Sequence, residues 1–397
     1  MANVSSSNGL EKRPRLAFRR TDGSNFPSWS RTSLSSIIEP YSEKVYGEHK
    51  YEVLTSSREG LQRQVDHFGT KQRHDTDGYN IIPIGYCTYR NRSDDGRFTF
   101  NINTISSNAI VSKFYPVFRF TNANSLFMSE FLNSSSRAKK KLSVLAVGTS
   151  QVVLSFEALK AAKFDLPCKD EQDKIASFFE CLNRRIEYQR TLVDALKKYK
   201  RGVLSVAFGK YGSICSWETT QYPFSVLASR RSEKYDPRLG EQMPCVELEH
   251  IEQETGRIIG SIPSTQQNSI KSVCKSGDTL FGKLRPYLRK YAFVKEDMVC
   301  SSEIWSLVPS ETIIPEYLFY LVQTDKFNKI ANISSGTKMP RAEWSNIEKS
   351  VFSVPSKEVQ AQIVQTLRGL DSRILDAIDL LDELQFLKRG LMQQLFI

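Results

Sequence analysis

The chain has 397 residues, of which 40% are hydrophobic and 25% are charged, and its formal net charge is +11. This composition excludes a largely disordered protein, and the length favours two or more domains. No apolar run reaches the roughly 18 residues that a membrane-spanning helix needs, and no apolar stretch follows the basic start as in a secretory signal, so we expect a cytoplasmic protein.

The positive charge favours a polyanionic partner, of which nucleic acid is the commonest. Cysteine and histidine give no sign of a metal site. The seven cysteines contain no CxxC pair, and the four histidines have no spacing typical of metal ligands. Reduced thiols explain widely spaced cysteines best, so no bound metal is expected.

The chain begins with a basic arm and continues into a stretch of mixed character. Residues 1–24 are rich in Ser, Asn and Arg, and we expect a loose arm there. Within residues 25–166, the runs YNIIPIGYCTY, RFTFNINTI and KFYPVFRF are rich in the β-branched and aromatic residues that favour short strands. This stretch is predicted to form a first globular domain.

A long helix is predicted over residues 167–209. Its apolar positions are separated by alternating steps of four and three residues, which is the 3.5-residue period of a coiled-coil seam. The seam consists of Ile175, Phe179, Leu182, Ile186, Val193 and Leu196, with Gln189 and Lys200 at two further positions. At about 1.5 Å per residue this helix reaches roughly 60 Å.

The second half of the chain has the same order of elements. Residues 210–354 contain the strand-like runs PCVELEHI, DTLFGKL, KYAFV and EIWSLV, and helical patches such as PEYLFYLVQTDKFNKI. A second long helix is predicted over residues 355–397. Its seam consists of Ile363, Leu367, Leu370, Ile374, Leu381 and Leu384.

The two halves are copies of one unit. Residues 166–208 align without a gap to residues 354–396, at an offset of 188 residues, and 14 of the 42 positions from Pro167 to Phe208 are identical. Chance at average residue usage gives roughly two or three identities. The same offset relates Ser28-Trp29 to Ser216-Trp217, so the duplication covers the chain.

This duplication predicts a mixed α+β protein with two tandem globular domains, each followed by a long helix. A seam of this length needs a partner helix, and the other copy is the nearest candidate. We therefore predict that the two helices pack as an antiparallel coiled coil with pseudo-two-fold symmetry. The alternative is that they are ordinary core helices of two separate domains, although the pattern runs longer than such helices usually do.

These motifs resemble the specificity subunit of type I DNA restriction-modification systems. The similarity lies in the pattern LPxxxEQxxI followed by a heptad helix that ends in KRGLMQQLF, and in GDTLFGKLRPYLRKYAF, VCSSEIWSLVP and SSGTKMPRAEWSNIEKSVFSVP. The first copy keeps Glu171 and Gln172, whereas the second keeps Gln360 but has Val359 where the family often has Glu. The first globular stretch is a weaker match.

The resemblance implies that each globular domain is a target recognition domain for one half of a split, asymmetric site in double-stranded DNA. It implies that the helices set the gap between the halves and dock two modification subunits, which methylate adenine with S-adenosylmethionine. Restriction subunits would add ATP- and magnesium-dependent translocation and cleavage. The specificity subunit itself would carry no cofactor and no catalytic residue.

The sequence contains no motif for such chemistry of its own. The chain has no D/N-P-P-Y/F motif of an adenine methyltransferase, no GxxxxGK[ST] loop for ATP and no GxSxG elbow. These absences agree with a role in binding DNA.

Basic and amide side chains in loops are the candidates for DNA contact, because Arg pairs well with guanine and Gln with adenine. The first-domain candidates are Lys71, Arg73, Arg90, Arg92, Arg97, Thr149, Ser150 and Gln151. The second-domain candidates are Arg230, Arg231, Lys234, Lys283, Arg285, Tyr287, Arg289, Thr337, Lys338 and Arg341. For any single residue, a solvated surface charge is an equally good explanation.

Two alternatives of other classes remain open at this point. The chain could be a coiled-coil adaptor that bridges two protein partners without reading DNA, and salt-sensitive DNA binding would separate this hypothesis from the first. It could also be an active piece of a fused restriction and methylation enzyme, which binding of S-adenosylmethionine by the isolated chain would support.

Overall fold

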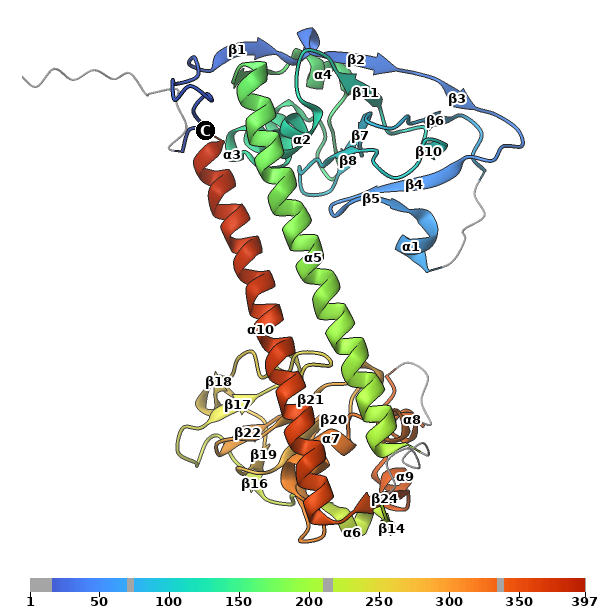
Figure 1. Cartoon of the computed structure of the whole chain (residues 1–397), viewed down its shortest axis with the longest axis vertical. Helices are drawn as coiled ribbons and strands as arrows, with labels where there is room; N and C mark the ends of the chain where they lie inside the picture. The colour runs from blue at the N-terminus through green and yellow to red at the C-terminus, as the bar shows by residue number, and fades with distance from the viewer. Residues whose placement is uncertain (1–15, 70–74, 210–216, 334–338, 397) are drawn as a thin grey trace, which may run out of the picture. The chain divides into compact units, whose positions relative to one another are not determined.

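The computed structural model describes residues 16–69, 75–209, 217–333 and 339–396, which fall into two compact units. The first unit comprises Met1–Tyr188 and Asp382–Ile397, and the second comprises Gln189–Leu381. The long helices α5 (Lys169–Phe208) and α10 (Lys357–Leu395) therefore each contribute one part to both units (Figure 1). No helix among the described residues is long and apolar enough to cross a membrane.

Two sheets of short strands form the first globular domain. The five-stranded sheet has the order β3–β6–β10–β4–β5, and the four-stranded sheet has the order β2–β11–β7–β9. The strand bounds are β2 Ile38–Tyr41, β3 Lys44–Val45, β4 Glu52–Ser57, β5 Gly60–Arg63, β6 Tyr79–Ile81, β7 Cys87–Tyr89, β9 Phe100–Ile102, β10 Ala109–Val111 and β11 Val117–Phe120. Two further ladders pair β1 (Ser30–Ser33) with β13 (Lys163–Leu166), and β8 (Arg92–Ser93) with β12 (Val152–Val153). The short helices are η1 Leu34–Ser36, α1 Gln64–Phe68, α2 Ser125–Ser134, α3 Ser136–Leu145 and α4 Phe156–Ala161.

The second globular domain repeats the two larger sheets of the first in the same strand order. Its five-stranded sheet has the order β16–β19–β22–β17–β18 and its four-stranded sheet the order β15–β23–β20–β21. The strand bounds are β15 Ala228–Arg230, β16 Lys234–Tyr235, β17 Pro244–Val246, β18 Ile262–Pro263, β19 Lys271–Cys274, β20 Thr279–Gly282, β21 Tyr291–Phe293, β22 Met298–Cys300 and β23 Ile304–Pro309. A separate ladder pairs β14 (Thr219–Pro223) with β24 (Val351–Pro355). The short helices are α6 Phe224–Leu227, η3 Leu248–His250, η4 Ser264–Gln266, η5 Pro286–Leu288, α7 Pro315–Leu321, α8 Asp325–Ala331 and α9 Trp344–Glu348.

Each domain contains one parallel strand pair at the same place in its five-stranded sheet. The pair is β10 with β4 in the first domain and β22 with β17 in the second, and the other ladders of these sheets are antiparallel. The shared strand order extends the sequence duplication to the fold. It confirms the predicted class, a mixed α and β protein with two tandem domains.

One predicted helical patch differs from the structure in detail. The run over residues 315–330 forms two helices, α7 and α8, and not one. The break lies at Thr324, whose backbone is extended and whose side chain accepts a hydrogen bond from the Phe327 N–H. A threonine in this N-cap position favours the start of a new helix over continuation of the preceding one.

A buried glutamine joins each long helix to its globular domain. In the first unit, the Gln172 side chain donates to the Pro167 carbonyl oxygen at 2.9 Å and accepts from the Asn124 N–H at 2.9 Å, just before α2. In the second unit, Gln360 donates to the Pro355 carbonyl oxygen at 3.0 Å and accepts from the Ile314 N–H at 2.9 Å, just before α7. The glutamine of the LPxxxEQ pattern therefore has a structural role, because it pairs backbone groups that would otherwise be buried unsatisfied.

The long helices are antiparallel within each unit. In the second unit, Val193 of α5 packs in one cluster with Ile374, Ala377 and Ile378 of α10. In the first unit, the early part of α5 meets the end of α10, where Phe179 lies 5.9 Å from Phe396 between ring centroids. The beginning of one helix thus contacts the end of the other.

All twelve seam residues predicted from the heptads are buried or half-buried. The fully buried ones are Ile175, Phe179, Leu182, Ile186, Val193, Ile363, Leu367, Ile374 and Leu384, and the half-buried ones are Leu196, Leu370 and Leu381. The polar seam position Gln189 donates to the Ala377 carbonyl oxygen at 2.8 Å. The seam therefore buries apolar side chains and satisfies its one interposed amide.

A lysine at equivalent seam positions forms an ion pair in each unit, with a carboxylate from a different place. Lys200 Nζ lies 2.6 Å from Asp371 Oδ1 of α10, and Tyr320 donates its hydroxyl to the same carboxylate. In the first unit the position of Asp371 is taken by Asn183, and the carboxylate comes from Glu130 of α2, 3.0 Å from Lys388 Nζ. Both units thus have the ion pair, but its acid lies on a long helix in the second unit and on a short helix of the globular domain in the first.

Breaking the Lys200–Asp371 pair is expected to destabilise the second unit strongly. The Lys200 side chain is 6% exposed, and its burial lowers its pKa, an effect that Asp371 opposes. Lys200→Met should lower the free energy of unfolding by about 3–5 kcal/mol, because the half-buried Asp371 loses its cation, and adding Asp371→Leu should restore most of the loss. Urea denaturation of the single and double variants measures this.

Lys388→Met is the matched control, because Lys388 occupies the equivalent position and its side chain is 24% exposed. Its effect should be clearly smaller, because the Lys388 ammonium is already partly solvated, whereas loss of Lys200 also removes the donor to the buried Gln323 at 2.7 Å. Equal losses for the two single variants would contradict this account.

Candidate nucleic-acid interface

Two predicted groups of the first domain lie next to each other. The loop with Arg90, Arg92 and Arg97 is joined to the segment of Thr149, Ser150 and Gln151 by the β8–β12 ladder. Gln151 also donates to Asp94 Oδ1 across the two segments at 3.0 Å. Among the structurally described first-domain candidates, all six are exposed.

The turn before Gln151 requires glycine. Gly148 has φ +140°, and a Cβ at this position would lie 2.2 Å from the Gln151 carbonyl oxygen. The backbone can therefore fold back closely at Gly148, and this places Thr149, Ser150 and Gln151 at an exposed tip.

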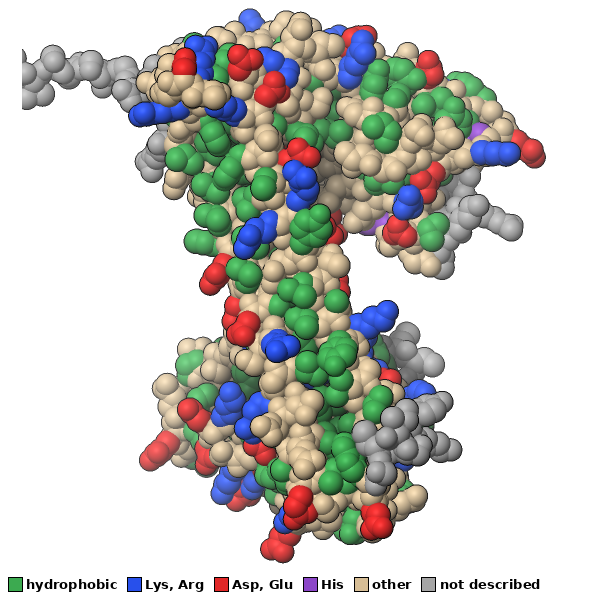
Figure 2. Space-filling view, viewed as in Figure 1, with side chains coloured by type: hydrophobic (Ala, Val, Ile, Leu, Met, Phe, Trp, Pro, Cys, Tyr) green, Lys and Arg blue, Asp and Glu red, His purple; other side chains and the backbone are tan. Residues whose placement is uncertain are grey.

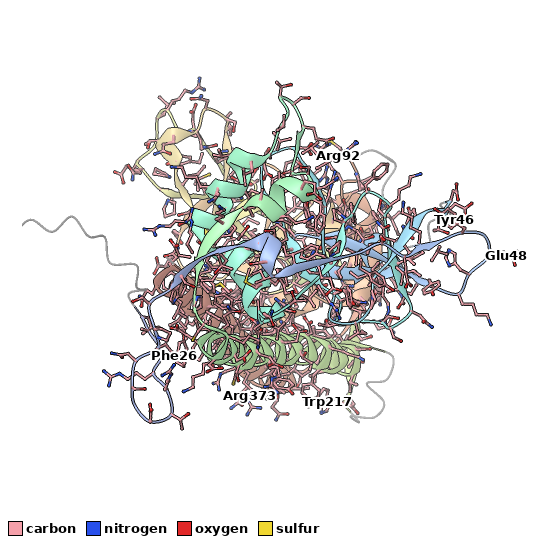
Figure 3. All side chains as sticks on the ribbon, turned by 90° about the horizontal axis from the view of Figure 1, so that it is seen from above. Phe26, Tyr46, Glu48, Arg92, Trp217 and Arg373 are labelled. Atoms are coloured by element: carbon pink, nitrogen blue, oxygen red, sulfur yellow. The ribbon has the colours of Figure 1, made fainter. Side chains whose placement is uncertain are left out.

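The arginines of this loop differ in their surroundings. The Arg92 guanidinium lies over the Phe114 ring at 5.5 Å, and Arg97 lies 3.8 Å from Asp95. Figure 3 shows Arg92 far from Phe26, which lies beside the long helices. Arg92 thus lies in a part of the first domain away from the long helices.

A basic cleft in the second domain joins two further predicted groups. The cleft has a volume of about 540 Å³. It is lined by Arg230, Arg231, Lys234 and Lys283, by Trp305 and Trp344, and by several serines. Cationic groups beside flat aromatic rings and small hydroxyls form the chemistry that nucleic-acid sites use for phosphate and base contacts.

Neighbouring arginines in this cleft have different roles. The exposed Arg230 lies over Trp344 at 4.9 Å and over Trp305 at 5.9 Å. Arg231 forms two short hydrogen bonds, of 2.7 and 2.8 Å, with Asp278, whose side chain is 2% exposed. The bonds to Asp278 raise the pKa of Arg231. Arg231 therefore neutralises a buried carboxylate, whereas Arg230 presents its charge at the opening.

The other two cations of the cleft come from separate strands and turns. Lys234 of β16 donates to Ser272 Oγ at 3.1 Å, which holds its ammonium above β19. Lys283 directly follows β20, where its N–H donates to the Glu303 carbonyl oxygen. Strand pairing thus brings together residues that are widely separated in the sequence.

Three further residues predicted to contact DNA lie in or beside the short helix η5. Arg285 and Arg289 flank it, with φ values of 51° and 49°, which are uncommon for residues other than glycine. Tyr287 between them is 53% exposed. The Arg285 N–H donates to the Pro340 carbonyl oxygen, so this loop lies beside the segment that contains Arg341.

Two arginines of this group are paired with acids. Arg289 lies 2.6 Å from Asp325, and Arg341 lies 3.0 Å from Glu303, which raises the pKa of Arg341. Because a carboxylate partly neutralises each of these two arginines, they contribute less positive charge to the surface than unpaired arginines would. Four other candidates, Lys71, Arg73, Thr337 and Lys338, lie outside the described residues.

The two tryptophans of the cleft were not among the residues predicted from the sequence to contact DNA. Trp305 lies on β23 and Trp344 begins α9, and both come from strings that carried the family resemblance. A tryptophan next to polar residues in such a string could have been predicted to contact nucleic acid. Their position under Arg230 follows only from the β15–β23 pairing and the packing of α9.

Over residues 16–69, 75–209, 217–333 and 339–396, no group of three or more His, Cys, Asp or Glu side chains could hold a metal ion. The candidate site therefore consists of basic, aromatic and hydroxyl side chains.

Known proteins share both the sequence features and the fold. The family model described as the type I restriction modification DNA specificity domain matches residues 35–198 and 240–384. The type I restriction enzyme HindI specificity subunit of Haemophilus influenzae is 32% identical over 112 residues, which cover 26% of this chain and 24% of that protein. The MjaVIII specificity subunit of Methanocaldococcus jannaschii is 23% identical over 239 residues, which cover 53% of this chain and 56% of that protein. The matched segments thus span between a quarter and just over half of these relatives.

Solved structures are similar over almost the entire chain. The S subunit of a type I restriction-modification system from M. genitalium has a TM-score of 0.56 at 14% identity, with 97% of this chain and 99% of that chain covered. A structure of a type I R-M system solved to explain complex assembly and conformational transition has a TM-score of 0.52 at 13% identity, with 94% and 98% covered. These likenesses concern the fold. Because the family model matches both halves and more than half of its length, the chain belongs to the specificity subunits of type I restriction-modification systems.

Proposed function

We propose that this chain is the DNA-reading subunit of a type I restriction-modification complex. Each globular domain reads one half of a split, asymmetric site in double-stranded DNA, and the long helices dock two modification subunits. Those subunits methylate adenine with S-adenosylmethionine, and restriction subunits add ATP- and magnesium-dependent cleavage. The chain itself supplies specificity and no catalytic residue, and it acts in the cytoplasm.

The observation that carries this proposal is the cleft in which Arg230 lies over Trp305 and Trp344. A guanidinium held against aromatic rings keeps its hydrogen-bonding edge free for a base or a phosphate. Trp305 and Trp344 lie within residues 240–384, which the family model matches, whereas Arg230 precedes the matched segment. Further cations line the cleft. The adjoining basic loop around η5 extends the positive surface along the same domain.

The decisive experiment is to sequence genomic DNA for N6-methyladenine in cells that carry this chain with its modification subunit. A split motif, with two short specified halves around a fixed gap, is the expected result. A complex that assembles but leaves no split motif would instead favour an adaptor without DNA readout.

Exchange of one domain is expected to change one half of the motif. Because the first globular domain is predicted to be residues 25–166, replacing this segment with the corresponding domain of another specificity subunit should change one specified half. The other half and the gap should stay as they were, since the second domain and both helices are retained. The methylated motif of the hybrid measures this, and a change in both halves would contradict one domain per half-site.

Substitution of Arg230 is expected to weaken DNA binding, whereas substitution of the adjacent Arg231 is expected to lower stability. Arg230→Gln should weaken DNA binding by about 5- to 150-fold, because a lost base or phosphate contact costs about 1–3 kcal/mol. It should lower the free energy of unfolding by no more than about 1 kcal/mol, since only the exposed contacts with the two tryptophan rings are lost. Arg231→Gln should lower the free energy of unfolding by about 3–5 kcal/mol, because it leaves Asp278 buried without its cation.

Fluorescence anisotropy with cognate and random duplexes, at several salt concentrations, separates the two kinds of contact at Arg230. An equal loss on both duplexes with a shallower salt dependence indicates a phosphate contact, whereas a loss on the cognate duplex alone indicates a base contact. Unchanged binding by Arg230→Gln on both duplexes would remove this residue from the interface.

A further inference from the structure

The turn between β10 and β11 of the first domain is repeated between β22 and β23 of the second. In each domain a backbone hydrogen bond joins the fourth residue of the turn to the first, at 2.9 Å in the first domain and 3.0 Å in the second. The first residue is a serine in both, and its hydroxyl oxygen accepts at 3.4 Å from the N–H two residues later. That N–H belongs to Phe114 in one domain and to Glu303 in the other. Phe114 and Glu303 therefore occupy the same position of the same turn.

The arginine beside this position is neutralised in the second domain and not in the first. Glu303 lies 3.0 Å from Arg341 and balances its charge. Phe114 instead lies below the Arg92 guanidinium, 5.5 Å from its ring, and the Lys113 ammonium lies 5.8 Å from the same ring. An aromatic ring attracts cations through its negative face without cancelling their charge. The first-domain turn therefore combines an aromatic ring with two cations that keep their charge.

This group is open to a ligand from solvent. Phe114 is 54% exposed, and Arg92 and Lys113 are exposed as well. Within residues 16–69, 75–209, 217–333 and 339–396, neither cation forms an ion pair. Lys and Arg side chains elsewhere often lie among Asp and Glu side chains, as on the face of the molecule that Figure 2 shows. An exposed ring between two uncompensated cations is the combination that nucleic-acid sites use for base and phosphate contacts.

The turn lies on the side of the fold that carries the cleft in the second domain. Ser302 and Ile304 of the second-domain turn line the cleft together with Arg230. Because the two turns are equivalent, the turn with Phe114 borders the corresponding part of the first domain. A ligand that is bound in the same way by both domains would meet Phe114.

The first domain does not repeat the aromatic cleft itself. In the β2–β11 ladder, Pro40 stands at the place that Arg230 has in the β15–β23 ladder, and Pro116 stands at the place of Trp305. A backbone hydrogen bond at the same end of each ladder, 2.8 Å long in the first domain and 2.9 Å in the second, fixes this correspondence. Two prolines supply no cation and no aromatic ring. On this side of the first domain, that chemistry is found at Phe114.

We propose that Phe114 contacts the apolar surface of a base in the half-site that the first domain reads, and that Arg92 and Lys113 contact the neighbouring phosphates. This inference rests on the proposed function, which supplies the DNA. The apolar surface belongs to the methyl group of a thymine in the major groove, or to the faces of two bases at a step that the ring opens. The two domains thus place their aromatic contacts at different positions of one fold.

The test measures binding of the assembled methyltransferase complex to two duplexes by fluorescence anisotropy. One duplex carries the split motif found by methylation sequencing, and the other has a random sequence. Phe114→Ala should weaken binding to the split motif by about fivefold or more, since an aromatic contact with a base is lost. It should change binding to the random duplex by less than about twofold. Lys113→Gln should weaken binding to both duplexes alike and make its salt dependence shallower.

Tyr46→Ala is the matched control. Tyr46 is another aromatic residue of the first domain and is 69% exposed, and Figure 3 shows it apart from Arg92. Among the residues that the structure describes, no lysine or arginine lies over its ring. Its substitution should leave both affinities unchanged. Because the altered side chains are exposed, all three variants should unfold at the temperature of the unmodified chain.

Two modified duplexes identify the base surface that Phe114 meets. Deoxyuridine in place of each thymine of the first half removes only the methyl group. A loss of affinity for the unmodified chain that is absent for Phe114→Ala assigns the contact to that methyl group. With 2-aminopurine in the first half, a rise in fluorescence on binding that Phe114→Ala abolishes assigns the contact to an opened base step.

Several results would overturn the inference. Unchanged binding of the split motif by Phe114→Ala, an equal loss on both duplexes, or the same loss for Tyr46→Ala would each exclude a base contact by Phe114. So would modified duplexes to which the unmodified chain and Phe114→Ala respond alike. Failure of the proposed function is distinct, because the unmodified complex would then assemble and leave no split motif in genomic DNA.

Discussion

The apolar seam of the two long helices is the constraint on which the rest of the structure depends. Neither α5 nor α10 can bury its stripe against its own domain alone, because each helix continues into both units. Each must pack against the other to be stable in water. In the antiparallel arrangement the beginning of each long helix packs against the end of the other. Equivalent residues of the two copies therefore bury each other's apolar stripe. The buried glutamines Gln172 and Gln360 then fix each domain to the start of its helix.

Both copies have the same ion pair on the helix seam, although the acidic residue that forms it differs between them. The seam lysine is kept in both copies, yet its acid is Asp371 in one unit and Glu130 in the other. An ammonium withdrawn from water is costly without a carboxylate, so Asn183 at the position of Asp371 is compatible with Lys388 because Glu130 of α2 supplies the acid. This exchange shows that the two domains diverged while the electrostatic demand of the helix pair stayed constant.

Local periodicity explains why the helices were predictable and the cleft was not. The heptads identified the seam because every residue from Ile175 to Leu196 lies on one element, where spacing alone determines the face. The strand runs were recognisable for the same reason, and the repeat supplied the tandem domains. Arg230 and Arg231 are adjacent and chemically identical in the sequence, and only the packing of Asp278 and Trp344 from distant segments separates a structural arginine from an exposed one.

A duplicated architecture also makes its two helix ends chemically different. In the second unit, α5 is followed along the chain by β14, whereas in the first unit the end of α10 meets residues from the opposite part of the sequence, as the Leu16–Gln394 hydrogen bond shows. A junction made by non-covalent contacts can gain or lose residues without disturbing either domain. Leu16 lies at that junction, so a difference between two otherwise equivalent helix ends is most easily introduced there.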